Sequence, residues 1–521
     1  MDQYVPSPPI NIGHWVKKWA SLQPQKPAII FENSVFTYQQ LNSRVNQVSN
    51  LLHEMGIRKG ERVGVLLYNS NAYIEVYFAL AKLGAILVPL NFRLKGTELE
   101  FILKDSGSET LFLGEEFVDV VGSIKSNIPV KEANYIGVGE TIPSWIIDYE
   151  KAIESKSTQE PQIGGVIGWE DPYIIMYTSG TTGFPKGAIL SHRKTFFNVL
   201  NADIYYGLTP HDIFLVTRPL FHSGGLLVET SPMLYKGGTI IIKKRFKPVE
   251  ILEAIEKYKV TVVEPPATLL KFILEQCDVK KYDLSSVKCW FTGGERVSPS
   301  LLKEYQKFGI IVSQLFGQTE TSTITWLPIS EASRKLGSVG IPVFHGDVKI
   351  MNEEGVEVKP GEVGEIVVSG PTLMSGYWGR PGATDETIKD GRLHTGDLAK
   401  VDEEGFFYIT DRKKDVIISG GENIYPAEVE KVFLENPKIS DVAVVGIPDE
   451  RWGEVGMAFI VLQEREKMTE EEALRFCEER MAKYKIPKSV KFVKELPQTA
   501  SQKIMRYKLR EEYLKQKNEK D

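Results

Sequence analysis

The residues best suited to chemistry lie in one short segment rich in glycine and hydroxyl groups. It reads Tyr177-Thr-Ser-Gly-Thr-Thr-Gly-Phe-Pro-Lys-Gly187 and stands between two apolar stretches, Tyr173–Met176 and Ala188–Leu190. Glycine lets the backbone fold closely around an anion, and the hydroxyl groups add neutral donors. Lys186 adds a positive charge that can follow departing phosphates. An ordinary hairpin also uses these residue types, but their density beside a lysine favours a phosphate-binding loop between two strands.

A Walker phosphate loop is excluded by the residues around Lys186. That pattern requires glycine immediately before the lysine and serine or threonine immediately after it. Here Pro185 precedes the lysine and Gly187 follows it. The sequence therefore predicts a phosphate loop of a different kind.

Bulk properties narrow the class of protein. A chain of 521 residues is longer than the length at which one hydrophobic core usually stops growing, so at least two domains are expected. The net charge of −6 argues against nucleic acid as the main partner, although a local site can still hold an anion. The scattered Cys277, Cys289 and Cys477 suit a reducing compartment and provide neither a disulfide framework nor a zinc site. Without a secretory signal or a stretch of about 18 apolar residues, a cytoplasmic location is expected.

The elements that position these residues alternate between helix and strand in the first half of the chain. Thr37 and Gln40 have the spacing of a capping box, and Gly56 supplies a C-terminal cap for the helix that follows. The next elements predicted are a strand at Val63–Leu67, a helix at Tyr73–Leu83 ended by Gly84, and a strand at Ala85–Val88. This alternation predicts an α/β protein with mixed, mostly parallel sheets and helices on their faces.

The pattern changes after about Gly340. Short strands bounded by glycine indicate a β-rich subdomain, and the charged stretch Asp411–Asp415 is a candidate hinge. A small, mobile α+β unit is expected beyond it, with strands at Ser440–Gly446, Val455–Leu462 and Val490–Val493 and a helix at Thr469–Tyr484. We therefore predict a large domain at 1–411 and a small domain at 412–521.

The loop resembles the phosphate loop of the adenylate-forming superfamily, which includes acyl-CoA synthetases, beetle luciferases and peptide-synthetase adenylation domains. Further segments match in the family's order: Phe221-His222, Thr292-Gly-Gly-Glu295, Phe316-Gly-Gln-Thr-Glu320, His394-Thr-Gly-Asp397, Asp411-Arg-Lys-Lys-Asp415 and Thr499-Ala-Ser-Gln-Lys503. The resemblance covers nearly the whole chain and points most closely to fatty acyl-CoA synthetases. It implies that a carboxylic acid reacts with ATP to give acyl-AMP and pyrophosphate, and then with coenzyme A to give acyl-CoA and AMP.

The resemblance also implies roles in binding ATP and Mg²⁺. Glu320 is expected to be catalytic and to ligate the metal together with Thr178, because Mg²⁺ prefers one or two carboxylates with phosphates and water. Phe316 would stack on adenine, although without the resemblance it would be taken as a core residue. Asp397 would accept the ribose hydroxyls and Arg412 would add a second contact. The full ATP-binding set so implied is Thr178, Ser179, Gly180, Thr181, Thr182, Gly183, Lys186, Gly293, Gly294, Glu295, Phe316, Gly317, Gln318, Thr319, Asp397, Arg412 and Lys503.

Lys503 is implied to be the catalytic lysine of the small domain. A lysine cation offers three donors to the converging oxygens of a carboxylate and a phosphate. Gln502 departs from the pattern, because similar enzymes usually have glycine there. We expect Gln502 to slow the delivery of Lys503 without abolishing it.

Two half-reactions would share one site if the small domain rotates about Lys414, as the resemblance implies. Ser419, Gly420 and Gly421 would then guide the pantetheine arm of coenzyme A. The two glycines suit the close approach of a thin ligand, but they suit a turn equally well. Exchange of catalytic segments by domain motion is an established way to complete successive sites.

The expected substrate follows from the segment after Phe221. Relatives that activate amino acids have aspartate at the next position, whereas this chain has His222, so no carboxylate would hold a substrate ammonium. His222 is implied to be catalytic and to lie over the carboxyl end of the acid, although a lone histidine could equally belong to the core. Small Ser223 and Gly224 with Leu226 suggest an apolar channel. A fatty acid of medium or long chain, and thus lipid metabolism, is predicted, with an aryl acid as the alternative.

Two other functional classes stay open at this point. A ligase that loads a separate carrier protein is one, although no carrier domain is recognisable in the sequence. A non-catalytic nucleotide-binding protein is the other, and the presence of Lys503, Glu320 and Asp397 together argues against it. The expected partners are the acid, ATP and coenzyme A, with neither nucleic acid nor a membrane-spanning segment, and a homo-oligomer is possible.

Overall fold

The computed structural model describes residues 11–178, 185–295, 297–419, 422–449, 452–478, 480–481, 483–498 and 504–518. The chain divides into two compact units: unit 1 comprises Met1–Val348 and Val368–Leu393, and unit 2 comprises Lys349–Val367 and His394–Asp521. Each unit is described by itself. The division at 411–412, with a hinge at 411–415, stays a prediction.

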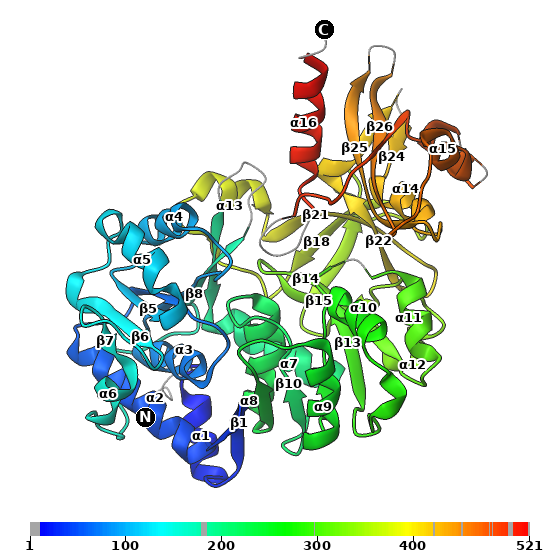
Figure 1. Cartoon of the computed structure of the whole chain (residues 1–521). Helices are drawn as coiled ribbons and strands as arrows, with labels where there is room; N and C mark the ends of the chain where they lie inside the picture. Colours follow the sequence, from blue (N-terminus) through cyan, green and yellow to red (C-terminus); the bar gives the residue numbers. More distant parts are fainter. Residues whose placement is uncertain are drawn as a thin grey trace, which may run out of the picture. The chain divides into compact units, whose positions relative to one another are not determined.

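Unit 1 is built on two large sheets (Figure 1). In the first, the parallel strands are β1, β11, β10, β12, β13 and β14, in spatial order. Strands β2, β15 and β16 pair antiparallel with their neighbours. Its nine strands, in spatial order, are β16 (Ile341–Pro342), β15 (Ser322–Trp326), β14 (Val312–Gln318), β13 (Cys289–Gly293), β12 (Val262–Val263), β10 (Ile213–Leu215), β11 (Thr239–Ile242), β1 (Pro27–Phe31) and β2 (Ser34–Thr37).

The second sheet of unit 1 has a parallel core and an antiparallel edge. Strands β3 to β8 pair in parallel, and β9 pairs antiparallel with both β8 and β19. Its eight strands, in spatial order, are β19 (Gly376–Tyr377), β9 (Lys186–Ser191), β8 (Pro172–Thr178), β4 (Ile86–Pro89), β3 (Arg62–Leu66), β5 (Thr110–Gly114), β6 (Tyr135–Val138) and β7 (Ile147–Asp148). The mostly parallel α/β fold predicted from the sequence is confirmed.

Helices connect these strands, and their burial ranges from α3, which is buried on every side, to α13, which has no buried residue. The helices of unit 1 are α1 (His14–Leu22), α2 (Tyr38–Glu54), α3 (Asn71–Leu83), α4 (Gly96–Ser106), α5 (Val118–Ile124), α6 (Tyr149–Glu154), α7 (His192–Tyr206), a π-helix (Gly224–Thr230), α8 (Ser231–Lys236), α9 (Pro248–Tyr258), α10 (Ala267–Gln276), α11 (Pro299–Gln306), α12 (Ile329–Ala332) and α13 (Pro381–Thr387). The capping box at Thr37 and Gln40 is present at the start of α2, and α3 ends at Gly84 in the left-handed conformation, as predicted.

The boundaries between the units fall inside three strands of one sheet. The order of this sheet is β17 (Asp347–Met351), β18 (Gly364–Ser369), β21 (Arg392–Val401) and β20 (Ile388–Lys389), and β22 (Phe407–Arg412) also pairs with β21. The second sheet of unit 2 is ordered β24 (Glu422–Ile424), β23 (Ile417–Ser419), β26 (Gly453–Leu462) and β25 (Ile439–Asp449), and β27 (Ser489–Phe492) pairs with β26. The helices of unit 2 are α14 (Pro426–Phe433), α15 (Glu470–Glu478) and α16 (Arg506–Asn518).

The long strand β25 explains the core of unit 2. Val442 and Val444 lie in one apolar cluster with Cys477 of α15, whereas Ala443 and Val445 lie in another with Leu509 of α16. Successive residues of a strand point to opposite faces, so a continuous apolar run indicates a sheet covered on both sides. Cys477 has no exposed surface and is part of this core.

Candidate active site

The predicted phosphate loop connects two antiparallel strands of unit 1. Thr178, at the end of β8, is the register partner of Lys186 at the start of β9. The loop therefore starts at the carboxyl end of a strand that pairs in parallel with β4, which is where ligands bind in open α/β sheets. Its central predicted residues, Ser179, Gly180, Thr181, Thr182 and Gly183, lie outside the described residues.

Glu320 collects the hydroxyl groups of two distant segments. The Thr178 hydroxyl donates to Glu320 Oε1 at 3.0 Å, and the Tyr377 hydroxyl donates to the same oxygen at 3.1 Å. Burial, together with the negative charge of Glu320, raises the pKa of Tyr377, so the phenol keeps the proton that it donates. Lys186 adds a cation 5.3 Å from the centroid of the Tyr377 ring. Two hydroxyl groups from different strands thus bond one carboxylate, with a lysine against the ring that carries one of them.

This cluster fits a magnesium ion held by few protein ligands. Glu320 and Thr178 supply a carboxylate and a hydroxyl 3.0 Å apart, and oxygen donors are the ligands that Mg²⁺ prefers. Among the described residues, no group of three or more histidine, cysteine, aspartate or glutamate side chains could hold a metal. Because Mg²⁺ keeps waters and phosphate oxygens rather than requiring a full protein cage, one carboxylate with a hydroxyl neighbour suits it.

A buried lysine beside Glu320 was not predicted from the sequence. The side chain of Lys194, on the first turn of α7, has no exposed surface, and its ammonium group donates to the hydroxyl of Ser322. Burial lowers the pKa of Lys194 to about 7, and the negative charge of Glu320 opposes that shift. The electrostatic environment of Glu320 therefore includes an ammonium group whose charge changes near neutral pH.

Two glycines bring the predicted adenine-binding segments into close contact with the backbone of their neighbours. A Cβ atom at Gly293 would lie 2.3 Å from the carbonyl oxygen of Leu315, and one at Gly317 would lie 2.0 Å from that of Ser322. Gly293 ends β13 and Gly317 lies near the end of β14, so both stand at the carboxyl edge of the parallel strands. Phe316, which precedes Gly317 in β14, is only half-buried and is not a core residue.

Glu295, another residue of the predicted ATP-binding set, has a structural role. Its carboxylate accepts hydrogen bonds from the backbone N–H of Thr268 at 2.8 Å and from the Thr268 hydroxyl. Thr268 lies in the first turn of α10, where backbone N–H groups lack partners within the helix. The sequence motif indicated a nucleotide contact, and only the folded chain reveals this cap.

The predicted acyl segment lies beside the Glu320 segment. The Ser223 and Thr319 hydroxyl oxygens are 3.4 Å apart. Gly224 donates its backbone N–H to His222 Nδ1 at 3.2 Å, so this ring nitrogen accepts a hydrogen bond from its own segment. Leu226, predicted to line an apolar channel, lies in the π-helix and has no exposed surface, and its predicted role stays a prediction. The unusual helix type at Gly224–Thr230 is typical of functional sites.

Unit 2 holds the predicted ribose-binding pair. Asp397 of β21 and Arg412 of β22 are register partners, and Arg412 Nε lies 2.7 Å from Asp397 Oδ1. The Asp397 side chain is 4% exposed and that of Arg412 is 42% exposed, so the carboxylate is fixed while the guanidinium stays accessible. The antiparallel pairing of β21 with β22 therefore places the two residues together, although 15 positions separate them in the chain.

The segment predicted to deliver Lys503 is flanked by two residues that form an isolated β-bridge. Gln498 and Ile504 form an antiparallel bridge, and Met505 donates its backbone N–H to Pro497 O at 2.8 Å. Lys503 and Gln502 lie outside the described residues. Gly420 and Gly421 also lie outside them, between the register partners Ser419 and Glu422 of a β-hairpin. Lys414 is exposed in a single 3₁₀ turn, Lys413–Asp415.

Comparison with known proteins identifies the family. The model of the AMP-binding enzyme family matches residues 16–378, and that of the AMP-binding enzyme C-terminal domain matches residues 428–503. This chain belongs to the AMP-binding enzyme family. The predicted relationship to the adenylate-forming superfamily is confirmed.

Relatives of this AMP-binding enzyme cover nearly its whole length. Feruloyl-CoA synthase from Amycolatopsis sp is 38% identical over 96% of the chain and 99% of the relative. The solved o-succinylbenzoate CoA synthetase from Bacillus subtilis, in complex with an acyl-adenylate intermediate, has a TM-score of 0.85 at 33% identity over 96% of this chain and 98% of that one. The same synthetase has been solved with ATP and a magnesium ion.

A fatty acyl CoA synthetase from Mycobacterium tuberculosis has a TM-score of 0.77 at 33% identity, covering 96% of this chain and 98% of that one. The predicted enzyme class, an AMP-forming acid–thiol ligase, is confirmed by these relatives together with the family.

Within the part of the AMP-binding enzyme that the structure describes, no helix is long and apolar enough to cross a membrane. The predicted cytoplasmic location stays a prediction.

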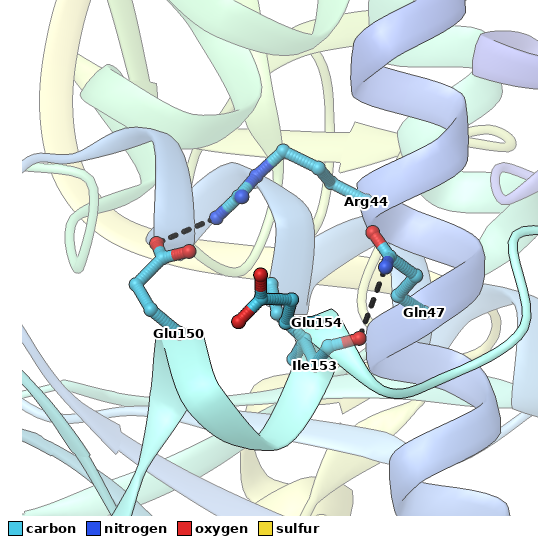
Figure 2. Close-up of a pocket in the computed structure, with 5 residues that line it drawn as sticks. All are labelled: Arg44, Gln47, Glu150, Ile153 and Glu154. Carbon is cyan, nitrogen blue, oxygen red and sulfur yellow. Dashed lines mark hydrogen bonds and ion pairs between the residues drawn. The ribbon is translucent and has the colours of Figure 1, made fainter.

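A hollow elsewhere in the AMP-binding enzyme has a structural role. Figure 2 shows Arg44 and Gln47 of α2 facing Glu150 and Ile153 of α6. Arg44 donates to Glu150 at 2.7 Å, and Gln47 donates to the carbonyl oxygen of Ile153 at 3.0 Å. These bonds fasten the short α6 to α2. The hollow is lined by none of the predicted site residues.

Proposed function

We propose that this AMP-binding enzyme is an ATP-dependent acid–CoA ligase that acts on an aryl acid. The observation that carries the proposal is the convergence of Thr178, Glu320 and Tyr377 at the end of the phosphate-loop strand. A carboxylate that attacks ATP meets repulsion between like charges, and positioning and charge neutralisation supply most of the catalysis in such reactions. The Glu320 carboxylate accepts hydrogen bonds from two hydroxyl groups, and the Lys186 cation lies against the Tyr377 ring. These groups suit that task.

The roles of the residues follow from this geometry. Thr178 and Glu320 would hold Mg²⁺, which when bound neutralises phosphate charge. Phe316 would stack on adenine, since its ring is half-buried beside the close-packed Gly317. Asp397 would accept the ribose hydroxyls, and Lys503 would bring its cation to the reacting oxygens.

The second half-reaction would take place in the same site. Rotation of the small domain about Lys414 would withdraw Lys503 and bring the Ser419–Glu422 hairpin to the adenylate. Coenzyme A would then attack the acyl-AMP through its thiol and release AMP. Gly420 and Gly421, which follow Ser419 in the sequence, have no side chains and would leave room for the pantetheine arm.

An aryl acid is supported by two relatives of nearly full length, whose names specify feruloyl and o-succinylbenzoate groups. A fatty acid is the second candidate, since one neighbour of similar identity is a fatty acyl CoA synthetase.

The test is a panel of acids incubated with ATP and Mg²⁺, with and without coenzyme A. The panel includes benzoate, cinnamate and their hydroxylated forms, a 4-oxo acid, octanoate and palmitate. AMP, pyrophosphate and an aryl thioester are expected when coenzyme A is present. ADP as the product would contradict the mechanism, and a higher kcat/KM for octanoate or palmitate would assign the enzyme to fatty acids. Acyl-AMP that accumulates with no thioester would indicate a separate carrier protein as the acceptor.

A further inference from the structure

Arg218 is a buried arginine that joins the acyl segment to the adenine segment of unit 1. It follows β10 and stands three residues before Phe221. Its Nη2 donates to the carbonyl oxygen of Gly293 at 2.9 Å, and its Nε donates to that of Glu264 at 3.2 Å. Asn69 holds the backbone around it by donating to Arg218 O and accepting from Leu220 N. The guanidinium is therefore fixed on two of its three sides.

Two buried glutamates balance the charge of this guanidinium. Arg218 Nε lies 3.2 Å from Glu229 Oε1, and Arg218 Nη2 lies 3.3 Å from Glu264 Oε1. The three side chains are 9%, 0% and 4% exposed, and the Tyr206 hydroxyl also donates to Glu264. Burial raises the pKa of both carboxyl groups, more strongly for Glu229, and the positive charge of Arg218 opposes the shift. One retained proton would leave the cluster uncharged overall.

The third side of the guanidinium, Nη1, faces two glycines. A Cβ atom at Gly294 would lie 2.9 Å from Nη1, and one at Gly224 would lie 3.4 Å from it. Nη1 makes no hydrogen bond to any residue that the structure describes, whereas Nε and Nη2 do. Both glycines belong to segments that the proposed function places around the adenylate. Nη1 thus packs closely against two glycine backbones between the acyl and the adenine segments, with no bond to a described residue.

From this arrangement we infer that Arg218 Nη1 donates a hydrogen bond to an oxygen substituent of the acid and so selects acids that carry one. The inference rests on the proposed function, because that function places the acid against the segment at residues 221–226. A buried donor that binds water or a ligand oxygen loses its partner when an apolar group displaces that oxygen. Sites built to bond a polar group of the substrate therefore reject the analogue that lacks it.

The charge of the cluster specifies the kind of oxygen. Glu229 and Glu264 already neutralise the guanidinium, so a second carboxylate on the acid would meet a site with no surplus positive charge. A hydroxyl, methoxy or carbonyl oxygen accepts a hydrogen bond without adding charge. The selected acids are therefore aryl acids with a neutral oxygen substituent.

The experiment compares acids of similar shape with and without the acceptor oxygen. Cinnamate and methylcinnamates are set against hydroxy- and methoxycinnamates substituted at each ring position, and kcat/KM is measured by AMP release. The wild-type enzyme is expected to prefer at least one oxygen-bearing acid by about tenfold or more. In Arg218→Lys, which keeps the buried positive charge but lacks the planar guanidinium edge, the preference is expected to fall below about threefold.

Two further variants separate recognition from simple destabilisation. Glu229→Gln leaves Arg218 paired with Glu264 and is expected to keep the preference. Arg218→Met/Glu229→Gln/Glu264→Gln replaces the whole cluster with neutral side chains and should lose the preference, because kcat/KM falls more for the oxygen-bearing acids than for cinnamate. An equal loss of kcat/KM for every acid in both Arg218 variants would show a purely structural role and overturn the inference. A wild-type enzyme that forms thioesters without regard to ring oxygens would also overturn it and leave the proposed function intact.

Discussion

The predicted site residues of unit 1 and those of unit 2 are positioned in different ways. In unit 1, Thr178, Tyr377 and Glu320 come from three separate segments and are bonded to one another at the ends of strands. In unit 2, Asp397 and Arg412 are cross-strand neighbours, and the Lys503 segment extends from the bridge between Gln498 and Ile504. Groups held by several elements keep a fixed geometry, whereas groups on hairpins can move as one piece. This difference suits a reaction in which unit 1 binds the phosphates and unit 2 exchanges catalytic segments.

The largest effect is expected for Lys503→Ala, which removes the cation that unit 2 would deliver. Adenylation should fall by about 1000-fold, because a donor aimed at developing charge contributes on that scale. Thioester formation from supplied acyl-adenylate should change far less, since the lysine would be withdrawn in that step. Pyrophosphate release and thioester formation, measured separately, check this. An equal loss in both steps would contradict the exchange of segments.

A large effect on stability is expected in unit 1 for Lys194→Met. The pKa of Lys194 is lowered to about 7 in the folded chain, so between that pH and its ordinary value the unfolded chain binds more protons and stability rises with pH. The variant should therefore be more stable than the wild type near pH 7, by up to about 4 kcal/mol, less the bond lost to Ser322.

Its advantage should shrink as the pH rises toward 10. Urea unfolding of the metal-free protein at pH 7, 8.5 and 9.5 measures this, with the exposed Lys151→Met as the matched control. A stability difference that does not vary with pH would show that Lys194 keeps its charge when buried.

Glu320→Gln should separate a metal ligand from a structural carboxylate. The amide can still accept from Thr178 and Tyr377 but binds Mg²⁺ poorly, so kcat/KM for ATP should fall by about 100-fold. Tyr377→Phe removes a single hydrogen bond and should cost less than about tenfold. Initial rates over a range of Mg²⁺ concentrations test both variants. Equal losses would place the two residues in one structural network with no special role for the carboxylate.

The smallest effect is expected for Gln502→Gly, next to Lys503 in unit 2. If this position requires a positive φ, glycine relieves about 1 kcal/mol of backbone strain. Adenylation should then be equal or up to about fivefold faster, with thioester formation unchanged. A large loss of adenylation would instead give the glutamine side chain a role of its own. Pre-steady-state pyrophosphate release distinguishes the two results.

Local patterns in the sequence determined the helices, the strands and the family. The capping box at Thr37, the cap at Gly84 and the apolar run of β25 depend on neighbours a few residues apart, so each could be predicted without coordinates. The motifs that identified the phosphate loop and Glu320 are likewise contiguous. They named the residue types needed for nucleotide chemistry and the order in which they occur.

Only the tertiary structure decided which side chains meet. Tyr377 reaches Glu320 because β19 pairs with β9, Lys194 is buried beside Ser322, and Arg218 is balanced by Glu229 and Glu264. Each contact joins positions far apart in the chain except Arg218 with Glu229, and none leaves a motif in the sequence. Burial in turn sets the charge of Lys194 and of the Arg218 cluster, because desolvation depends on the surrounding atoms and not on the residue type.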